Sequence, residues 1–337
     1  MSEPGKTTWW KKITGGAVPL SCYGKLPFYR DFITVDGGQK VCAQFRRWLD
    51  AAFGKRWEDL DSKGEELDGP RRILFVPARS QEVALGSVWN SHDEGGLRRF
   101  PFAFFVPLPA RKINPAGDGF LRDLVPLWTS MEERFHTLGG YGNVADFYSD
   151  YRGLVLAPDQ ENGGERPPGA RQTRAADLHA ALRESGPDSG GLLGTAWMAA
   201  RACRWGLEGG RELEAIRFPL VSSMDSMLQA ETWVRFLARN APDLPVPLNL
   251  VLPQEAGSEG TFTVVLRPLT APDARLLSPR AAKAEGVLDL ADRDRRDDAK
   301  MPAKYVERLK ARLKREDFTL DKFAGLRISR RALKREG

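Results

Sequence analysis

The chain has 337 residues, of which 42% are hydrophobic and 28% charged, as is typical of a globular protein with one large or two ordinary cores. No run approaches the roughly 18 apolar residues of a membrane-spanning helix, and the first residues lack the apolar segment of a secretory signal, so we expect a cytoplasmic protein. The net charge is +6, and residues 271–337 hold 19 basic against 12 acidic side chains, so the positive excess belongs to the C-terminal end.

Residues 1–19 are expected to form an N-terminal extension ahead of the folded part. Trp9 and Trp10 stand there beside two lysines, an arrangement that allows at most a peripheral contact with a membrane surface. A helix is expected over residues 41–53, because apolar residues recur there at steps of three and four. Trp48 lies on its apolar side, so we expect it to be buried against a neighbouring phenylalanine-rich strand.

The rest of the first half alternates short apolar runs with one longer helical pattern over residues 119–136. The short runs are rich in β-branched and aromatic residues, which favours strands. In one of them, strict alternation places Phe100, Phe102 and Phe104 on one face and Phe105 on the other, as expected for a central strand covered on both sides. The expected strands span residues 17–24, 72–78, 82–89, 100–108 and 152–158.

The second half begins after residues 158–173, a stretch rich in glycine and proline that we expect to be a linker or a long loop. Helical patterns at residues 175–185 and 226–240 alternate with apolar runs that favour strands. The pattern of residues 191–210 is ambiguous between the two periods. The expected strands span residues 215–221, 247–253 and 261–269.

The composition becomes highly charged from residue 281 on, so we expect this part to be solvated. A helix expected over residues 304–316 carries one narrow apolar stripe with basic side chains around it. We expect the stripe to dock on the body and to leave a basic face free for a partner. The candidate interaction residues of this tail are Tyr305, Leu309, Leu313, Arg308 and Arg312.

Together these elements predict an α+β fold with a mainly antiparallel sheet and packed helices, two α/β subdomains and a basic helical tail. The order strand, helix, strand, strand occurs in both halves, which leaves an internal duplication open. The predicted parts are the extension 1–19, a first α/β domain 20–157, the linker 158–173, a second α/β domain 174–280 and the basic helical tail 281–337.

The chemistry-bearing residues match no catalytic or cofactor motif. Lys25 follows a single glycine, and proline 27 removes an amide, so the backbone donors of a phosphate-binding loop are missing. The odd number of cysteines is typical of a reducing compartment, and the histidines lie too far apart in sequence to indicate a metal site. We therefore predict no catalytic residue, metal or other cofactor. The cysteines and histidines are Cys22, Cys42, Cys203, His92, His136 and His179.

Two segments are notable when they are taken in order. The first, "YGKLPFYRDF", contains a Gly-Lys-Leu-Pro and an Asp-Phe pattern and precedes a tryptophan-bearing helix. The second, "SHDEGGLRRFPF", contains a Ser-x-Asp, arginine and Phe-Pro pattern before a strand. In this order, the two segments resemble the TagF family associated with type VI secretion. Arg30 replaces the usual glycine, and Gly95 and Gly96 lengthen the second segment. The resemblance covers roughly residues 20–150. The matching residues are Gly24, Lys25, Leu26, Pro27, Asp31, Phe32, Ser91, Asp93, Arg98 or Arg99, Phe100 and Pro101.

The resemblance implies a bacterial, cytoplasmic accessory protein that restrains or helps to assemble type VI secretion by protein–protein contact, and not an enzyme. It implies secretion components as partners, among them a forkhead-associated scaffold protein, and recruitment to the inner-membrane secretion complex. We expect no small-molecule substrate and no nucleic acid as partners. Within the motif, Asp31 is expected to accept hydrogen bonds from the backbone or from Arg98 or Arg99.

Two other functions stay open. A hydrolase would use loop carboxylates near Asp31 and Asp93, and it would need a deep polar pocket in which two carboxylates converge. Alternatively, the basic tail would bind nucleic acid or another anionic surface. Base stacking usually needs aromatic rings among the basic residues, and the tail offers only Tyr305, Phe318 and Phe323 for it.

Overall fold

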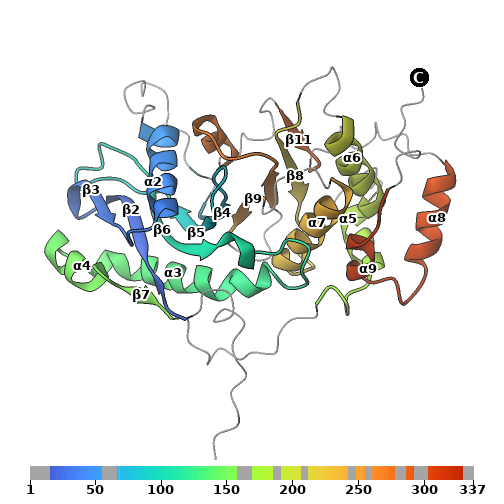
Figure 1. Cartoon of the computed structure of the whole chain (residues 1–337), viewed down its shortest axis with the longest axis horizontal. Coiled ribbons are helices and arrows are strands. Elements are labelled where there is room, and N and C mark those ends of the chain that lie inside the picture. The colour runs from blue at the N-terminus through green and yellow to red at the C-terminus, as the bar shows by residue number, and fades with distance from the viewer. Residues whose placement is uncertain are drawn as a thin grey trace, which may run out of the picture.

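The computed structural model shows a twisted sheet with helices on both faces (Figure 1). The expectations for residues 1–15, 158–168 and 292–302, and for the side chain of Tyr305, lie outside the described residues. In the part of the chain that is described, no helix combines the length and the apolar character needed to cross a bilayer. The described residues are 16–54, 67, 69–157, 169–184, 191–205, 212–241, 248–254, 260–277, 286–291 and 303–328.

Nine of the described strands form one sheet in the spatial order β11-β8-β10-β9-β4-β5-β6-β2-β3. Neighbouring strands of this sheet pair antiparallel, except that β11 runs parallel to β8. The fold is therefore α+β with a mainly antiparallel sheet, as predicted. The strands are β2 (Ser21–Leu26), β3 (Tyr29–Val35), β4 (Arg71–Phe75), β5 (Glu82–Trp89), β6 (Phe102–Pro109), β8 (Ala215–Pro219), β9 (Asn249–Pro253), β10 (Thr261–Val265) and β11 (Val287–Asp289), and a separate pair joins β1 (Val18–Pro19) to β7 (Val155–Leu156).

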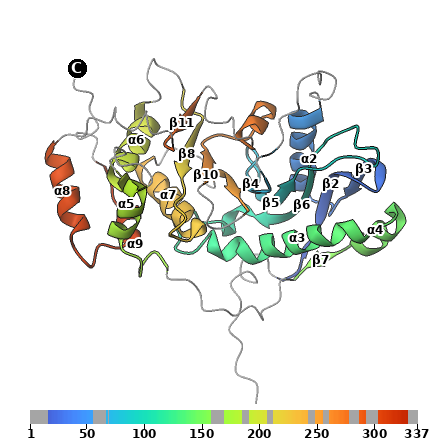
Figure 2. The ribbon, with the colours of Figure 1, turned by 180° about the vertical axis from the view of Figure 1, so that it is seen from behind.

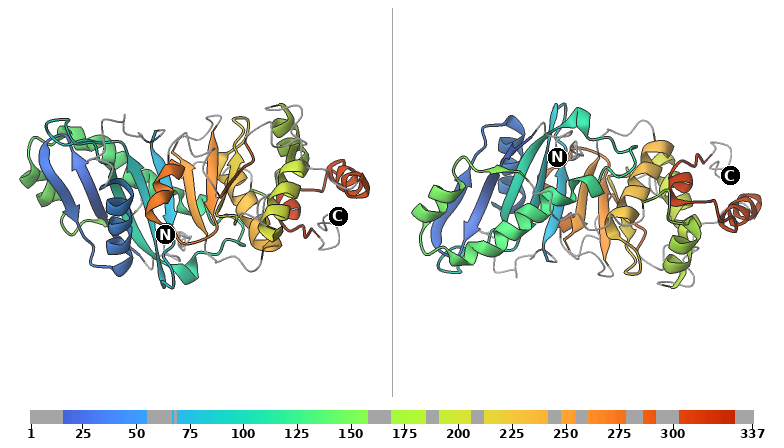
Figure 3. Two further views of the ribbon diagram at one scale, coloured as in Figure 1. Left: turned by 90° about the horizontal axis from the view of Figure 1, so that it is seen from above. Right: turned by 90° about the horizontal axis from the view of Figure 1, so that it is seen from below.

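Helices cover both faces of the sheet (Figures 2 and 3). On one face lie α2 and the 3-10 helix η6, which contact each other. On the opposite face lie α3 and α7, and α6 and α9 pack against α7. The helices are α2 (Lys40–Phe53), α3 (Val125–Thr137), α4 (Val144–Tyr151), α5 (Ala175–Glu184), α6 (Gly191–Trp205), α7 (Ser226–Asn240), α8 (Ala303–Leu313) and α9 (Leu320–Ala324), with 3-10 turns η2 (Ala110–Lys112), η3 (Arg122–Leu124), η4 (Leu138–Gly140) and η6 (Ala271–Leu277).

Helix α2 buries the side that its apolar period predicts. Trp48 is 6% exposed, so its predicted burial is confirmed. Its ring contacts Phe45 and Phe75, with ring centroids 5.7 Å and 5.9 Å away. The expected contact with the phenylalanine-rich strand β6 is made by Phe45, which lies 4.9 Å from Phe105.

The phenylalanines around β6 lie on both faces, but one of them is not on the predicted face. Phe102 and Phe104 belong to the core that contains α3, and Phe105 lies on the α2 side as expected. Phe100 also lies on the α2 side, although strict alternation predicts the other. The alternation fails because the strand starts only after Pro101, which has no N–H to contribute to the ladder.

The segments before and after the predicted linker each supply one block of neighbouring strands. The first block contains β2 to β6, and the second contains β8 to β11. The two blocks meet where β4 pairs with β9, for example at Ile73 opposite Val251, so the sheet is continuous across the junction. The division into two separately folding domains stays a prediction.

The C-terminal region contains more than the expected charged helix. Its strand β11 extends the sheet beside β8, and its short helix α9 packs on α7. Phe323 of α9 is fully buried and stacks on Phe236 at a centroid distance of 5.4 Å. Elements of three and five residues are too short to show a period, so the sequence pattern did not reveal them.

Helix α8 buries most of its expected apolar stripe. Leu309 and Leu313 are 5% and 7% exposed and belong to the main core. These two leucines are therefore covered by the body and are not open to a partner. Arg308 and Arg312, the other described candidates of the tail, are exposed.

Candidate functional site

The first motif segment forms a β-hairpin with an irregular second strand. Strands β2 and β3 pair at Gly24 opposite Ile33 and at Leu26 opposite Tyr29. Between these two pairs, β2 has the single residue Lys25, whereas β3 has residues 30–32. The two extra residues of β3 form a bulge, which bends a strand and re-aims its side chains. The bulge lies in the edge strand of the sheet, at the left of Figure 1.

Gly24 lets the hairpin approach the strand beside it. Its φ of +139° is one that residues with a side chain rarely adopt. A Cβ atom built there would lie 2.2 Å from the carbonyl oxygen of Pro101 and 2.7 Å from the Cα of Phe102. The backbone at Pro101 therefore occupies the space that any other side chain at position 24 would need.

The buried side chain of Lys25 stabilises the bulge through a hydrogen bond to its backbone. This side chain is 1% exposed, and Nζ donates a hydrogen bond of 2.7 Å to the carbonyl oxygen of Arg30. The ammonium group also lies 4.4 Å from the centre of the Phe32 ring, within the range of a cation–π contact. Burial, followed by the charge of Arg98, lowers the pKa of Lys25.

The second motif segment, the loop between β5 and β6, reaches the same carbonyl group. The Asp93 carboxylate accepts hydrogen bonds of 3.1 Å from the amides of Leu97 and Arg98 and one of 2.7 Å from Arg98 Nε. Arg98 Nη2 then donates a 2.7 Å hydrogen bond to the Arg30 carbonyl oxygen. Two cationic side chains, one from each segment, therefore fix a single backbone oxygen at the bulge.

Ser91 joins the two segments directly. Its Oγ donates a 2.7 Å hydrogen bond to the carbonyl oxygen of Lys25. The Ser91 carbonyl oxygen accepts a hydrogen bond from the amide of Phe100, so the start and the end of the loop are held together. The structure thus brings together Gly24, Lys25, Ser91, Asp93, Arg98 and Pro101 from the predicted set.

The bulge leaves three consecutive side chains exposed, those of Arg30, Asp31 and Phe32, which we call the bulge tripeptide. Phe32 is 39% exposed, although its ring stacks on Tyr23 at a centroid distance of 5.3 Å and meets the edge of Phe100 at 4.8 Å. Its position is therefore fixed while part of the ring remains open to solvent.

Two details of the site differ from the expectation. The carboxylate partner of Arg98 is Asp93, and not Asp31, which is exposed on the bulge. Arg99 pairs through its backbone with His92. The sequence reasoning also missed Leu97, which is 87% exposed on the same loop. A leucine in a polar, glycine-rich turn is the signal that points to it.

The edge of the sheet is poorly suited to pairing with another strand. The amide of Thr34 in β3 donates a 3.3 Å hydrogen bond to the hydroxyl of Tyr148 in α4. Residues 30–32 interrupt the regular ladder next to it. Bulges and covered amides are devices that prevent edge-to-edge association of sheets. Recognition at this site would therefore depend on side chains and not on an added strand.

The amino-acid sequence of this region matches a family model. Residues 21–136 match the family described as the TagF N-terminal domain, type VI secretion system-associated. The matched range contains both segments that hold the bulge. Residues 21–136 are a TagF N-terminal domain. The chain therefore contains a domain of a type VI secretion-associated family, in agreement with the resemblance of its two motif segments.

Among solved structures, the chain is similar to the crystal structure of PA0076 from Pseudomonas aeruginosa PAO1, with 14% sequence identity and a TM-score of 0.38. The similarity covers 77% of this chain and 94% of that chain. No curated protein sequence matches the chain.

An open hollow of about 410 Å³ lies beside the hairpin turn of the TagF domain. Its walls come from residues 26–28, from residues 90–92, and from the end of α3 with the turn that follows. Neither Asp31 nor Asp93 lines it. Among the described residues, no group of three or more histidine, cysteine, aspartate or glutamate side chains is placed to hold a metal ion.

The ionisation of Asp93 fits its role in holding the loop. Burial alone would raise the pKa of this carboxyl, but the hydrogen bonds and the charge of Arg98 outweigh burial and lower it. A carboxylate with a lowered pKa stabilises the folded state above its unfolded pKa. This contribution is lost as the pH falls through the folded-state pKa.

We expect the amide proton resonances of Leu97 and Arg98 to follow the ionisation of Asp93, because its carboxylate accepts both hydrogen bonds. In an NMR titration of the intact chain, both should shift with a midpoint below the ordinary value of 3.8. The Asp93→Asn variant, which has no charge to lose, should abolish this transition. A midpoint at or above 3.8 would show that Arg98 does not hold the carboxylate in solution.

Proposed function

We propose that this protein is a non-enzymatic accessory protein of a bacterial type VI secretion system that acts by protein–protein contact. It restrains the apparatus after translation or serves as an adaptor in its assembly. Its site of action is the cytoplasm, with recruitment to the inner-membrane secretion complex. Its partners are secretion components, and a forkhead-associated scaffold protein is the first candidate among them.

One observation carries this proposal. The polar side chains of the motif form hydrogen bonds to the backbone of the bulge, while the side chains of the bulge tripeptide are exposed to solvent. Lys25 and Arg98 both donate to the carbonyl oxygen of Arg30. A fixed, partly exposed aromatic ring that follows two exposed charged residues is typical of a protein-recognition surface, where aromatic residues and arginine are enriched. Leu97 extends the exposed apolar surface on the neighbouring loop.

The hydrolase alternative has less support from the same residues. A general acid or base works best when its pKa lies near the working pH. The pKa of Asp93 is lowered instead, and its carboxylate accepts three hydrogen bonds from the loop that it holds. Asp31, the second carboxylate of that hypothesis, does not line the hollow beside the motif.

The side chains of Arg30 and Asp31 provide a sharp test. Because Lys25 and Arg98 bond to the Arg30 backbone, the variant Arg30→Gln/Asp31→Asn keeps the hydrogen bonds that form the bulge. It also leaves the net charge unchanged. We expect affinity capture from cells to recover secretion components with the parent chain and about tenfold less with this variant, as for a loss of roughly 1.4 kcal/mol of binding free energy.

The matched control is Arg174→Gln/Asp177→Asn, which also removes one exposed charge of each sign, but near the start of α5. This control should capture the same components at the parent level. Both variants should melt at the parent temperature, since exposed substitutions usually change stability little. Equal capture by the parent and the bulge variant would remove the bulge tripeptide as the recognition surface.

A further inference from the structure

The hollow beside the turn between β2 and β3 is lined mainly by rings. Its volume of about 410 Å³ is within the usual range of ligand pockets. Its wall includes residues 26–28, which end one residue before the bulge tripeptide, so the two sites are neighbours. None of the described residues that line the hollow has a carboxylate, ammonium or guanidinium group. The lining rings belong to Pro27, Phe28, His92, Phe135, His136 and Tyr141.

The aromatic rings of this wall are held in place by their neighbours. Phe135 stacks on the buried Trp89, with the ring centroids 4.1 Å apart and the planes 2° from parallel. The hydroxyl of Tyr141 donates a 2.7 Å hydrogen bond to Asp150, and the Tyr141 ring lies 6.0 Å from that of Phe28. A site whose walls are already ordered loses less conformational entropy when a ligand binds. The hollow is therefore prepared for a flat, apolar group.

One residue of the wall offers a hydrogen-bond acceptor. His92 Nδ1 lies 2.8 Å from the carbonyl oxygen of Asp93. Because a carbonyl oxygen can only accept, Nδ1 carries the proton, and Nε2 of the neutral ring has a free lone pair. Nε2 has no hydrogen-bond partner among the described residues, and the side chain is exposed. The hollow thus combines aromatic walls with an acceptor whose tautomer is set by the backbone.

We propose that the hollow binds one aromatic side chain of a partner protein, a tyrosine or a tryptophan, which has a hydrogen-bond donor on its ring. The ring packs against the aromatic wall, and its O–H or N–H donates to His92 Nε2. Tyrosine hydroxyls and indole N–H groups usually have such a partner when they are buried. Aromatic residues seated in pockets often supply much of the binding free energy of an interface. The inference rests on the proposed function only in assigning the side chain to a partner protein.

The same features make other occupants less favourable. A phenylalanine or leucine side chain would cover His92 Nε2 and leave its lone pair without a donor, which costs free energy. A carboxylate would be repelled by that lone pair, and no lysine or arginine is among the described residues that line the hollow. Charge and hydrogen bonding therefore both favour a neutral ring that carries a donor.

The test uses the intact chain and three small probes, the N-acetyl amides of tyrosine, tryptophan and phenylalanine. The tyrosine and phenylalanine probes differ only in the hydroxyl group. In an NMR titration, binding is followed by the backbone amide resonances of His92 and Gly139, which line the hollow. We expect the tyrosine and tryptophan probes to bind about fivefold more tightly than the phenylalanine probe, as for the net gain of one hydrogen bond.

The variant His92→Ala should remove this advantage, because it has no acceptor at the wall. The matched control His136→Ala removes the other histidine of the hollow and should keep the advantage. Both variants should melt at the parent temperature, since both side chains are exposed. The proposal is overturned if neither probe with a donor binds more tightly than the phenylalanine probe, or if the advantage persists in His92→Ala. Tighter binding of free tyrosine or tryptophan than of the amides would indicate an amino-acid site and would also overturn it.

Failure of this proposal can be distinguished from failure of the proposed function. The variant Arg30→Gln/Asp31→Asn should bind the three probes like the parent, because neither residue lines the hollow. In affinity capture from cells, His92→Ala should recover about fivefold less of the secretion components than the parent does. Unchanged capture by His92→Ala would overturn the assignment to a partner. If the parent captures no secretion component, the proposed function fails, while the probes still test the hollow.

Discussion

Replacing Trp48 with alanine is expected to lower the free energy of unfolding by about 3–5 kcal/mol, the usual cost of truncating a large buried aromatic side chain. Trp48 is 6% exposed and its ring contacts those of Phe45 and Phe75. Removing the indole would leave a cavity between α2 and the sheet. Neighbouring rings held by tertiary packing close such a cavity only in part, so the cost includes lost contacts as well as lost burial.

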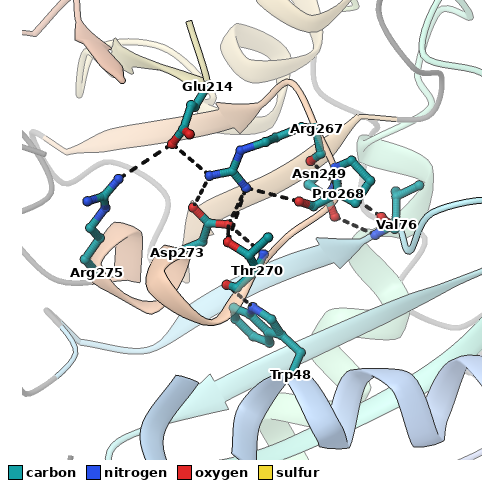
Figure 4. A network of polar contacts seen from close by, with 9 residues as sticks. All are labelled: Trp48, Val76, Glu214, Asn249, Arg267, Pro268, Thr270, Asp273 and Arg275. Carbon is teal, nitrogen blue, oxygen red and sulfur yellow. Dashed lines mark hydrogen bonds and ion pairs between the residues drawn. The ribbon is translucent and has the colours of Figure 1, made fainter. Parts of the chain in front are cut away.

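Trp48 also links the two blocks of the sheet. Its Nε1 donates a 2.8 Å hydrogen bond to the carbonyl oxygen of Thr270, just before η6 (Figure 4). That segment is held in turn by Asp273, which accepts hydrogen bonds from Arg267 and from Thr270. Asn249 of β9 extends the network to the backbone of Val76, after β4. A loss at Trp48 is therefore expected to weaken both blocks together.

Urea unfolding followed by circular dichroism measures this effect, and Trp48→Phe is its control. Phenylalanine keeps an aromatic ring in the site but has no N–H for Thr270, so its expected cost is roughly 1–3 kcal/mol, that of a buried group left without its partner. The transition of each variant should stay cooperative. A cost of Trp48→Ala below that of Trp48→Phe would contradict the packing seen in the structure.

The burial of Trp48 could be predicted from the sequence, but its partner could not. The period of three and four along residues 41–53 selects one side of the helix without any tertiary information. The acceptor at Thr270 lies 222 residues away, and it is a backbone oxygen that any residue type would supply. Contacts of this kind depend on how the two blocks meet, and no local pattern encodes that junction.

At the bulge site, too, the sequence predicts which residues matter but not what they contact. The sequence picked out Lys25, Asp93 and Arg98 as chemically notable residues. The structure shows that Lys25 and Arg98 converge on the carbonyl of Arg30, and side-chain identity carries no information about a backbone acceptor. The side of Phe100 was missed for a similar reason, because alternation holds only within a regular strand and β6 starts at Phe102.

A second large effect is expected where an ion pair lies beneath α3. Arg72 of β4 donates two hydrogen bonds to the Glu132 carboxylate, from Nε at 2.7 Å and from Nη2 at 2.8 Å. Both side chains are 9% exposed, and the guanidinium group lies 5.8 Å from the centre of the Trp128 ring. The bidentate geometry gives each carboxylate oxygen a hydrogen-bond donor. A buried ion pair needs such hydrogen bonds to offset the free-energy cost of removing its charges from water.

Arg72→Ala is expected to lower the free energy of unfolding by about 3–5 kcal/mol, because it leaves the Glu132 carboxylate buried without its cation. The double variant Arg72→Met/Glu132→Leu removes both charges and fills a similar volume, so it should lose much less. A smaller loss of unfolding free energy in the double variant indicates a buried ion pair. If the two side chains contributed only packing, the double variant would lose at least as much unfolding free energy as the single variant. Urea unfolding of Arg72→Met, Glu132→Leu and the double variant gives the coupling between the two residues. Additive losses would show that Arg72 and Glu132 do not interact in solution.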